Sequence, residues 1–303
     1  MSFEITILGS RSALPIKNHF PTAQVLQVRE RLFLIDCGEG CQMQLLRAGL
    51  SLLRIDAVFI SHLHGDHLFG LFGLLSTMSM LGRMDILPIY APAPMDAVLR
   101  DHLHYFGDGM TYQPAVRCIP TDSRALIYEN KAMTVETVPL RHRIPASGFL
   151  FREKMPLRNV HRHLVAHYKL PISAIIQLKN GEDITLPDGE RLDSETMTYL
   201  PYMPCAYAYC SDTLFSEAVI EAVRGVDLLY HEATFQSDRA ELAKQTMHST
   251  AADAATVARE AGVKKLLIGH FSSRYPSSEG FLHEAQAIFP DTEIGEELMT
   301  YKC

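Results

Sequence analysis

The stretch Ala57-Val58-Phe59-Ile60-Ser61-His62-Leu63-His64-Gly65-Asp66-His67 predicts both the fold and the chemistry of this chain. Its first five residues have the apolar, β-branched character of a buried strand, and they deliver three histidines and an aspartate into one turn. Imidazole nitrogen and carboxylate oxygen are the ligands that zinc takes in open catalytic sites. His62 and His64 lie on one side of an extended segment. Asp66 and His67 come from the start of the next helix and can serve a second ion.

Further candidate ligands follow three other apolar strands. His142 comes after the strand that ends at Pro139, Asp212 follows the run Tyr207–Cys210, and His270 follows Leu266-Leu267-Ile268-Gly269. Strand ends in layered α/β proteins converge on a ligand crevice. Each of these residues alone is more often an ordinary loop residue, whereas together with the first cluster they complete two coordination shells.

Short apolar runs alternate with longer amphipathic stretches, which predicts an α/β (α+β) layered fold. We expect strands at Glu4–Leu8, Ala23–Val28, Leu32–Asp36, Ala57–Ser61, Ile86–Tyr90, Thr134–Pro139, Gly148–Phe151, Ala206–Cys210, Asp227–His231 and Lys265–Gly269. We expect helices at Gly40–Ala48, Leu68–Leu81, Met95–Tyr105, Thr213–Val223, Asp238–Lys244, Ser249–Ala261 and Ser277–Phe289. The helix from Ser249 has that serine as its expected N-cap.

Residues 152–200 fit this alternation poorly and predict an inserted arm in a single domain of residues 1–303. The turn signals Asn180-Gly181 and Pro187-Asp188-Gly189 suggest a hairpin, after a helical segment at Asn159–Tyr168. The chain has a formal net charge of −7, yet residues 141–169 carry seven Lys and Arg against one acid, a net +6. That basic segment is either a solvated face or a surface for a polyanion.

Bulk properties exclude several classes of protein. No stretch approaches the roughly 18 consecutive apolar residues that span a bilayer, and the N-terminal residues do not resemble a signal peptide. The six cysteines show no CxxC pair, so we expect free thiols in a reducing compartment. These observations predict a cytoplasmic protein without a membrane partner.

The histidine and aspartate pattern resembles the metallo-β-lactamase superfamily, and more narrowly the ribonuclease Z family of tRNA 3′-processing endonucleases. The matching stretches span the chain: Ile35-Asp36-Cys37-Gly38-Glu39-Gly40, Ser61–His67, Ser211-Asp212-Thr213, His231-Glu232-Ala233-Thr234, His248-Ser249-Thr250 and Gly269-His270-Phe271-Ser272-Ser273-Arg274-Tyr275. The resemblance implies a four-layer αββα sandwich with an inserted arm. It also implies two Zn²⁺ per subunit, with Mn²⁺ as the alternative.

The resemblance further implies a role for each site residue. His62, His64 and His142 would hold the first metal, Asp66, His67 and His270 the second, and Asp212 would bridge the two. Asp66 would also orient the attacking water and accept its proton. His248 would be the general acid and Glu232 its orienting partner. From the residues alone, His248 could equally be a helix-start residue and Glu232 a surface acid.

The expected activity is removal of the 3′ trailer of precursor tRNA, leaving a 3′-hydroxyl on the tRNA and a 5′-phosphate on the trailer. In the family an inserted arm grips the tRNA, often across a homodimer, so we expect a homodimer here. Candidate RNA-binding residues are Arg152, Lys154, Arg158, Arg162 and Lys169 in the basic segment, and Arg274 and Tyr275 near the site. Arg274 could instead form an ion pair within the fold.

Two other functions compete with this one. A small-molecule hydrolase of the same fold, acting on a thioester, lactam or sulfate ester, would not need the basic arm. A non-catalytic RNA-binding module that keeps metal for stability would not need every ligand together with Glu232 and His248. The sequence retains all of these residues.

Overall fold

The computed structural model describes residues 3–303, and the chain divides into two compact units. The first unit contains the residues up to Arg152 together with Cys205–Cys303, and the second is Glu153–Pro204. The second unit therefore interrupts the first, and its bounds lie within a few residues of the arm expected at 152–200.

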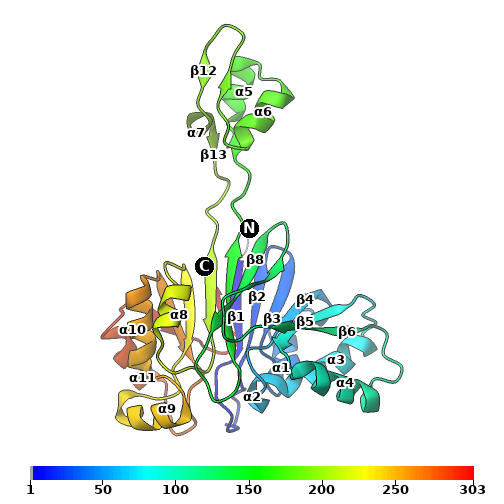
Figure 1. The fold of residues 1–303 in the computed structure, drawn as a ribbon, viewed down its shortest axis with the longest axis vertical. Coiled ribbons are helices and arrows are strands. Elements are labelled where there is room, and N and C mark those ends of the chain that lie inside the picture. Colours follow the sequence, from blue (N-terminus) through cyan, green and yellow to red (C-terminus); the bar gives the residue numbers. More distant parts are fainter. Residues whose placement is uncertain (1–2) are drawn as a thin grey trace. The chain divides into compact units, whose positions relative to one another are not determined.

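The first unit is built on two seven-stranded sheets (Figure 1). One sheet has the order β18-β1-β2-β3-β4-β5-β6. Its strands are β1 (Phe3–Gly9), β2 (Ala23–Val28), β3 (Arg31–Ile35), β4 (Ile55–Phe59), β5 (Leu87–Pro92), β6 (Pro114–Ile119) and β18 (Thr300–Lys302). The neighbours β3, β4, β5 and β6 are parallel, so their carboxyl ends lie at one edge of the sheet.

The second sheet has the order β17-β16-β15-β14-β9-β8-β7. Its strands are β7 (Leu126–Glu129), β8 (Met133–Pro139), β9 (Ser147–Glu153), β14 (Ala206–Cys210), β15 (Leu228–Glu232), β16 (Lys265–Gly269) and β17 (Thr292–Ile294). Strands β14, β15, β16 and β17 are parallel. All ten predicted strands are present, and the four strands of these two sheets that the sequence did not predict are the edge strands β6, β7, β17 and β18.

Helices cover the outer face of each sheet (Figure 1). The first sheet carries α1 (Cys41–Arg47), η1 (Leu52–Arg54), α2 (Gly65–Leu68), α3 (Gly70–Met80) and α4 (Met95–Phe106). The second carries α8 (Glu217–Ala222), η2 (Ser237–Arg239), α9 (Ala240–Thr246), α10 (Ala251–Ala261) and α11 (Glu279–Gln286). Each of the seven predicted helices overlaps one of these elements. The N-cap of α10 is Thr250, which forms a capping box with Asp253, so the expectation of Ser249 as cap is wrong by one residue.

Three apolar cores separate these four layers. One lies between the first sheet and its helices, and another between the second sheet and α8, α10 and α11. The third fills the space between the sheets with large aromatic side chains, among them Phe33, Phe59, Phe149, Phe151 and Tyr207. The predicted αββα sandwich is confirmed.

The second unit has a small core of its own. Its elements are β10 (Asn159–Val160), α5 (Arg162–Tyr168), α6 (Ile172–Lys179), β11 (Ile184–Thr185), β12 (Arg191–Leu192), α7 (Ser194–Met197) and β13 (Thr198–Tyr199). The predicted hairpin is β11–β12, which turns at Gly189 with a φ of +93°. Leu178 and Leu192 lie in its apolar core.

The sequence also led to expectations about the cysteines and about membrane-spanning segments. Cys205 and Cys303 form a disulfide, so the expectation of free thiols is wrong for this pair. The partners lie 98 residues apart in the sequence, with Cα atoms 6.1 Å apart, so the cysteine spacing gave no sign of it. Within residues 3–303, no helix combines the length and apolar character needed to cross a membrane.

Candidate metal centre and active site

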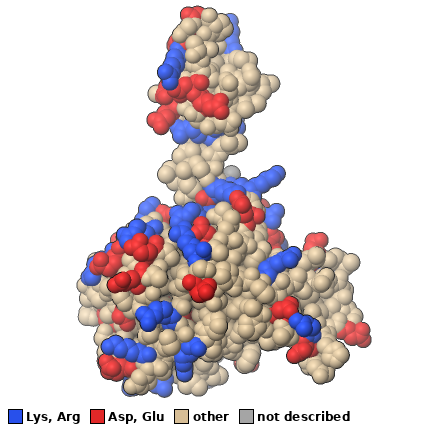
Figure 2. Space-filling model, viewed as in Figure 1, with Lys and Arg blue, Asp and Glu red and all other residues tan. Residues whose placement is uncertain are grey.

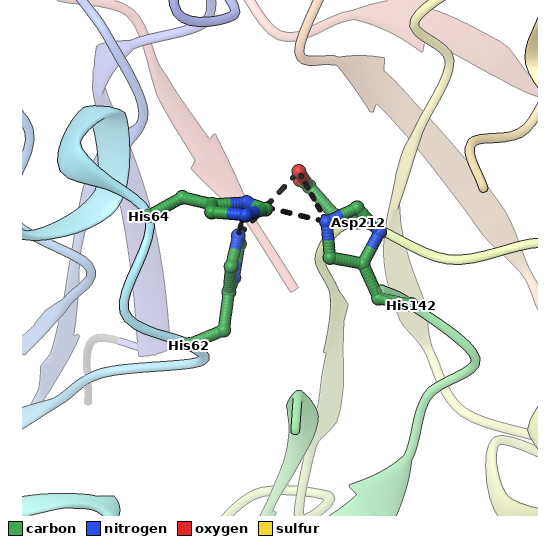
Figure 3. A group of neighbouring side chains, drawn as sticks. All are labelled: His62, His64, His142 and Asp212. Carbon is green, nitrogen blue, oxygen red and sulfur yellow. Dashed lines mark hydrogen bonds and ion pairs between the residues drawn. The ribbon is translucent and has the colours of Figure 1, made fainter. Parts of the chain in front are cut away.

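Three histidines and one aspartate converge on a common point (Figure 3). His62 and His64 follow β4, His142 follows β8, and Asp212 follows β14. Nδ1 of His64 lies 3.0 Å from Nε2 of His62 and 3.2 Å from Nε2 of His142. Oδ2 of Asp212 lies 3.5 Å from Nε2 of His62 and 3.7 Å from Nε2 of His142. The four side chains therefore surround a space of the size of one metal ion.

A second group shares Asp212 with the first. Oδ2 of Asp66 lies 3.6 Å from Nε2 of His67 and 3.5 Å from Nε2 of His270. Oδ1 of Asp212 is 3.3 Å from each of the same two nitrogens. Asp212 thus turns one carboxylate oxygen toward each group, which is the geometry of a bridging ligand.

Two of these ligands reach the site because the strands that precede them belong to one parallel set. Cys210 of β14 pairs with His231 of β15, which pairs with Ile268 of β16. Asp212 and His270 each come two residues after the paired position on their own strand. Hydrogen bonding in the sheet therefore brings residues almost 60 positions apart in sequence to one edge. His270 adopts a left-handed conformation with a φ of +63°, which costs roughly 1–3 kcal/mol and is typical of functional sites.

Hydrogen bonds behind the histidines determine which ring nitrogens face inward. Nδ1 of His67 donates to Oδ2 of Asp36 at 2.8 Å. Nδ1 of His142 donates to the carbonyl oxygen of Met247 at 2.9 Å. A neutral imidazole has one N–H, so in the neutral form of each ring Nε2 is the nitrogen that can bind a metal.

His270 is oriented in the same way through Thr234. The Thr234 hydroxyl donates to Oε2 of Glu232 at 2.7 Å, so it accepts from Nδ1 of His270 at 2.8 Å. The Nε2 atoms of His67 and His270 then face each other at 3.3 Å, and each carries a lone pair when its ring is neutral. Such a pair is repulsive unless a cation lies between the two nitrogens.

The spacing of the ligand atoms fits a divalent metal. Bonds of about 2.0–2.1 Å from zinc to nitrogen or oxygen place the corners of a tetrahedron about 3.3–3.4 Å apart. In the second group, the separations between Asp66, His67, His270 and Asp212 are 3.3–3.6 Å. The chain therefore presents a divalent-metal site made of nitrogen and oxygen ligands.

Asp36 supports this site from behind and was not among the predicted site residues. It is fully buried and left-handed, with a φ of +54°. Its carboxylate accepts hydrogen bonds from the backbone and hydroxyl of Ser61 at 2.7 and 2.8 Å, from His67 at 2.8 Å and from the hydroxyl of Tyr209 at 2.5 Å. The sequence signal was present, since Asp36 lies in one of the stretches that match the family.

Glu232 and His248 form a second pair beside the metal ligands. Nδ1 of His248 lies 2.9 Å from Oε1 of Glu232. The same carboxylate accepts from the backbone of Thr213 and Ser249 at 3.1 Å, and from the backbone and hydroxyl of Thr234 at 2.9 and 2.7 Å. Glu232 is fully buried and every donor points at it, so the carboxylate is held ionised and fixed in place.

The pKa shifts of this pair follow from burial and charge. Burial alone would raise the pKa of Glu232, but the adjacent His248 outweighs it and lowers that pKa. Burial alone would lower the pKa of His248, but Glu232 outweighs it and raises the pKa of His248 to about 9. Likewise, burial opposes charge on Asp212, yet His270 and His67 hold the pKa of Asp212 well below its usual value.

A cavity of about 400 Å³ opens over the metal ligands. His248 lines it, and because Nδ1 of that ring is bound by Glu232, Nε2 is the nitrogen that can serve the cavity. Arg143 and Arg274 also line it. Tyr275 does not, since its hydroxyl donates to Asp238 at 2.6 Å and its ring packs against Phe281.

The other predicted RNA-binding residues are spread over both units. Arg152 is exposed in β9 of the first unit, while Lys154 is half-buried at the start of the second. Arg158 is half-buried and its guanidinium donates to Thr198. Arg162 and Lys169 are exposed at the two ends of α5.

The second unit as a whole is not basic. Residues 153–204 contain six Lys and Arg against seven Asp and Glu, a net charge of −1. Figure 2 shows groups of both signs on one face of this unit. Six of the seven acids come from residues 182–195, which lie outside the basic segment counted in the sequence.

Comparison with known proteins identifies the family. A ribonuclease Z of Phocaeicola vulgatus is 47% identical over 297 residues, which are 98% of this chain and 96% of that protein. A ribonuclease Z of Bacteroides fragilis is 46% identical and covers 97% of each chain. The chain belongs to the ribonuclease Z family. The predicted family and the predicted class of enzyme, an endonuclease of the hydrolase group, are confirmed.

Solved structures show the same fold. The crystal structure of the human short-form tRNase Z matches with a TM-score of 0.71 and 24% identity, covering 99% of this chain and 98% of that one. A metallo-β-lactamase fold protein from Bacillus subtilis matches with a TM-score of 0.69 and 17% identity over all of both chains. The metallo-β-lactamase fold expected from the sequence is therefore confirmed.

A family model matches the first half of the chain. It is described as Anti-Pycsar protein Apyc1 and covers residues 3–156. This range includes His62–His67 and His142 but ends before Asp212, Glu232, His248 and His270. The His-Glu-Ala-Thr and His-Ser-Thr stretches, which contribute to the resemblance to ribonuclease Z, lie beyond it.

Proposed function

We propose that this chain removes the 3′ trailer of precursor tRNA as a dinuclear zinc endoribonuclease. The observation that carries the proposal is the combination of two adjoining ligand groups joined by Asp212 with the buried Glu232–His248 pair at the same cavity. Full-length similarity to proteins named ribonuclease Z supports tRNA as the substrate.

The proposed ligand sets follow the two groups of side chains. His62, His64 and His142 hold one zinc ion, Asp66, His67 and His270 hold the other, and Asp212 binds both. The absence of thiolate ligands allows Mn²⁺ as an alternative metal. The inward-facing Nε2 atoms of His67, His142 and His270 support this assignment.

The reaction needs one proton acceptor and one proton donor. Bound zinc would stabilise charge on the phosphate oxygens and make water acidic enough to give hydroxide near pH 7. Asp66 orients the attacking water and accepts its proton as the new P–O bond forms. His248 gives the proton on Nε2 to the 3′ oxygen as the P–O3′ bond breaks. The tRNA keeps a 3′-hydroxyl, and the trailer leaves with a 5′-phosphate.

Other residues position the proton donor and the substrate. Glu232 holds Nδ1 of His248 at 2.9 Å, which stabilises the protonated ring and aims Nε2 at the cavity. Arg143 and Arg274 line the cavity and supply positive charge for the phosphate. Arg143 was counted in the basic segment but was not among the predicted RNA-binding residues.

The arm and the quaternary structure complete the proposal. Arg162 and Lys169 are exposed and support contact of the arm with tRNA phosphates. We propose a homodimer, supported by the exposed run Met80, Leu81, Met84 and Ile86 between α3 and β5. Light scattering on the purified protein tests the dimer. Processing of precursor tRNA supports the expected cytoplasmic location.

Incubation of the purified protein with a 3′-extended precursor tRNA, with and without chelator, tests the function. We expect metal-dependent cleavage near the discriminator base, abolished in Asp66→Ala and slowed about 100-fold or more in His248→Ala. Metal analysis should find two zinc ions per chain. Mapping of the product ends should give a 3′-hydroxyl on the tRNA.

The competing functions are outcomes of the same experiment. Hydrolysis of small esters with the precursor left intact would favour a small-molecule hydrolase. Tight tRNA binding without cleavage would favour a non-catalytic, metal-stabilised module. Such a module needs no general acid, so it would not account for the pairing of Glu232 with His248.

A further inference from the structure

A second cavity, of about 660 Å³, adjoins the metal centre. It shares Ala13, Gly65 and Asp66 with the catalytic cavity, so the two spaces adjoin at a proposed metal ligand. Its remaining walls are mostly rings and apolar groups: Pro15, Phe20, Pro21, Gly40 and Phe69, with His19 and Glu39. His248, Arg143 and Arg274 line only the catalytic cavity.

Phe69 is an exposed aromatic residue of this cavity. It lies between α2 and α3 and is 65% exposed, although a phenylalanine ring is stabilised by burial. Its ring lies against the backbone of Gly65, where an added Cβ would come within 2.3 Å of Cε2 of Phe69. The absence of a side chain at Gly65 therefore lets the ring lie beside Asp66. The fold therefore holds the Phe69 ring in the wall of the cavity, and most of that ring is exposed to solvent.

The charges of the two cavities differ. Arg143 and Arg274 suit the catalytic cavity to a phosphate. No Lys or Arg is among the described residues that line the Phe69 cavity, and Glu39 and Asp66 are both acidic. A phosphate would be repelled there, whereas a flat, uncharged nucleobase can stack on an aromatic ring.

We propose that this cavity binds the base of the first trailer nucleotide, stacked on Phe69. The inference rests on the proposed function, because His248 protonates the 3′ oxygen of the tRNA. The last tRNA nucleotide must then lie within reach of His248, which does not line the Phe69 cavity. The nucleotide on the other side of the scissile phosphate is the one that can enter the cavity beside Asp66.

The test compares two substrates with two proteins, measured as kcat/KM. One substrate is a precursor tRNA with a normal first trailer nucleotide, and the other is the same RNA with an abasic residue there. For the wild type, we expect removal of the base to slow cleavage about 5- to 100-fold. Phe69→Ala should show the same loss on the normal substrate and no further loss on the abasic one. Phe69→Trp should restore the preference for the base.

Three controls separate binding of the base from other effects. Phe106→Ala removes another phenylalanine ring, 69% exposed at the end of α4 and outside both cavities, and should keep the wild-type response. Zinc content and melting temperature should be unchanged in Phe69→Ala. If removal of the base lowers kcat/KM by the same factor in the wild type and in Phe69→Ala, the inference is overturned while the proposed function stands. A wild type that leaves precursor tRNA intact would overturn both.

Discussion

Nδ1 of His248 lies 2.9 Å from Oε1 of Glu232, and this contact joins two stretches that the sequence places 16 residues apart. The carboxylate is fully buried and accepts four further hydrogen bonds from Thr213, Thr234 and Ser249. Glu232 therefore cannot turn away to solvent when His248 loses its proton. Its carboxylate lies in direct contact with the imidazole of His248, so one substitution can change the proton affinity of that ring.

Glu232→Gln should move the alkaline limb of kcat to lower pH. Glu232 raises the pKa of His248 to about 9, so the ring keeps its proton, and the acid function, up to that pH. Without the negative charge of Glu232, burial is the largest remaining influence and Asp212 opposes it only in part, so the pKa of His248 should fall. We expect kcat to fall about 10- to 100-fold at pH 8, with a smaller loss at pH 6.

The position of the alkaline limb is measured from the pH profile of kcat on precursor tRNA for the wild type and Glu232→Gln. Glu241→Gln is the matched control, because Glu241 is an exposed carboxylate paired with Lys244 on α9. A Glu232→Gln profile that keeps its alkaline limb near pH 9 would show that another group sets it.

Asp36→Asn should weaken metal binding without contacting the metal. The carboxylate accepts the Nδ1 proton of His67 and three donors from Ser61 and Tyr209, and an amide cannot accept all four. Asparagine tolerates the left-handed backbone at this position, so the change acts on the hydrogen bonds. We expect zinc affinity to fall about 10- to 100-fold.

Competition with a chromophoric chelator gives the affinity. Asp56→Asn serves as control, because Asp56 pairs with Arg31 at the surface and not with a ligand. Melting of the metal-free proteins separates lost affinity from lost folding. Wild-type affinity in Asp36→Asn would show that His67 needs no carboxylate behind it.

Removal of metal should destabilise the first unit. Without a metal ion, the Nε2 atoms of His67 and His270 still lie 3.3 Å apart beside two buried carboxylates, so only protons remain to balance the buried charge. A ligand present at about 1,000 times its dissociation constant contributes about 4 kcal/mol to folding. We therefore expect EDTA to lower the melting temperature by roughly 5–15 °C, and zinc to restore it. An unchanged melting temperature, in protein shown by mass spectrometry to lose bound metal, would contradict this.

The central fold could be predicted because its strands are buried on both faces. Such strands have nearly continuous apolar sequences, and the ten that were predicted include β4, β14 and β16, which carry the ligands. The four missed strands are the sheet edges. Thr300–Lys302 of β18, for example, is short and largely exposed, so its composition resembles that of a loop.

The convergence of candidate ligands could also be predicted, because His142, Asp212 and His270 each follow an apolar strand. The hydrogen bonds behind them could not. Asp36 reaches His67, 31 residues away, and Tyr209, 173 residues away, and no local pattern signals such contacts. Phe69 resembles any apolar residue at the start of a helix, and only its exposure beside Gly65 distinguishes it.

The charge of the arm shows a further limit of the sequence pattern. The basic segment 141–169 ends in the middle of the second unit, and the acids at 182–195 belong to the same unit. Arg158, which looked like a phosphate contact, donates instead to Thr198 and holds β13 near β10. Arg162 and Lys169, at the ends of α5, are the predicted RNA-binding residues of this unit that are exposed to a substrate.

Arg162→Gln combined with Lys169→Asn should weaken binding of precursor tRNA and reduce its salt dependence. Both side chains are exposed at the ends of α5, and asparagine suits the left-handed backbone at Lys169, where φ is +47°. Loss of two phosphate contacts should lower the slope of log Kd against log salt by about one to two. Hydrolysis of a small phosphodiester should be unchanged, because it occupies only the metal centre.

The pair Lys179→Gln and Arg191→Gln removes the same charge from the same unit and should have a smaller effect. Equal losses in both double variants would mean that the arm acts through its net charge and not through α5.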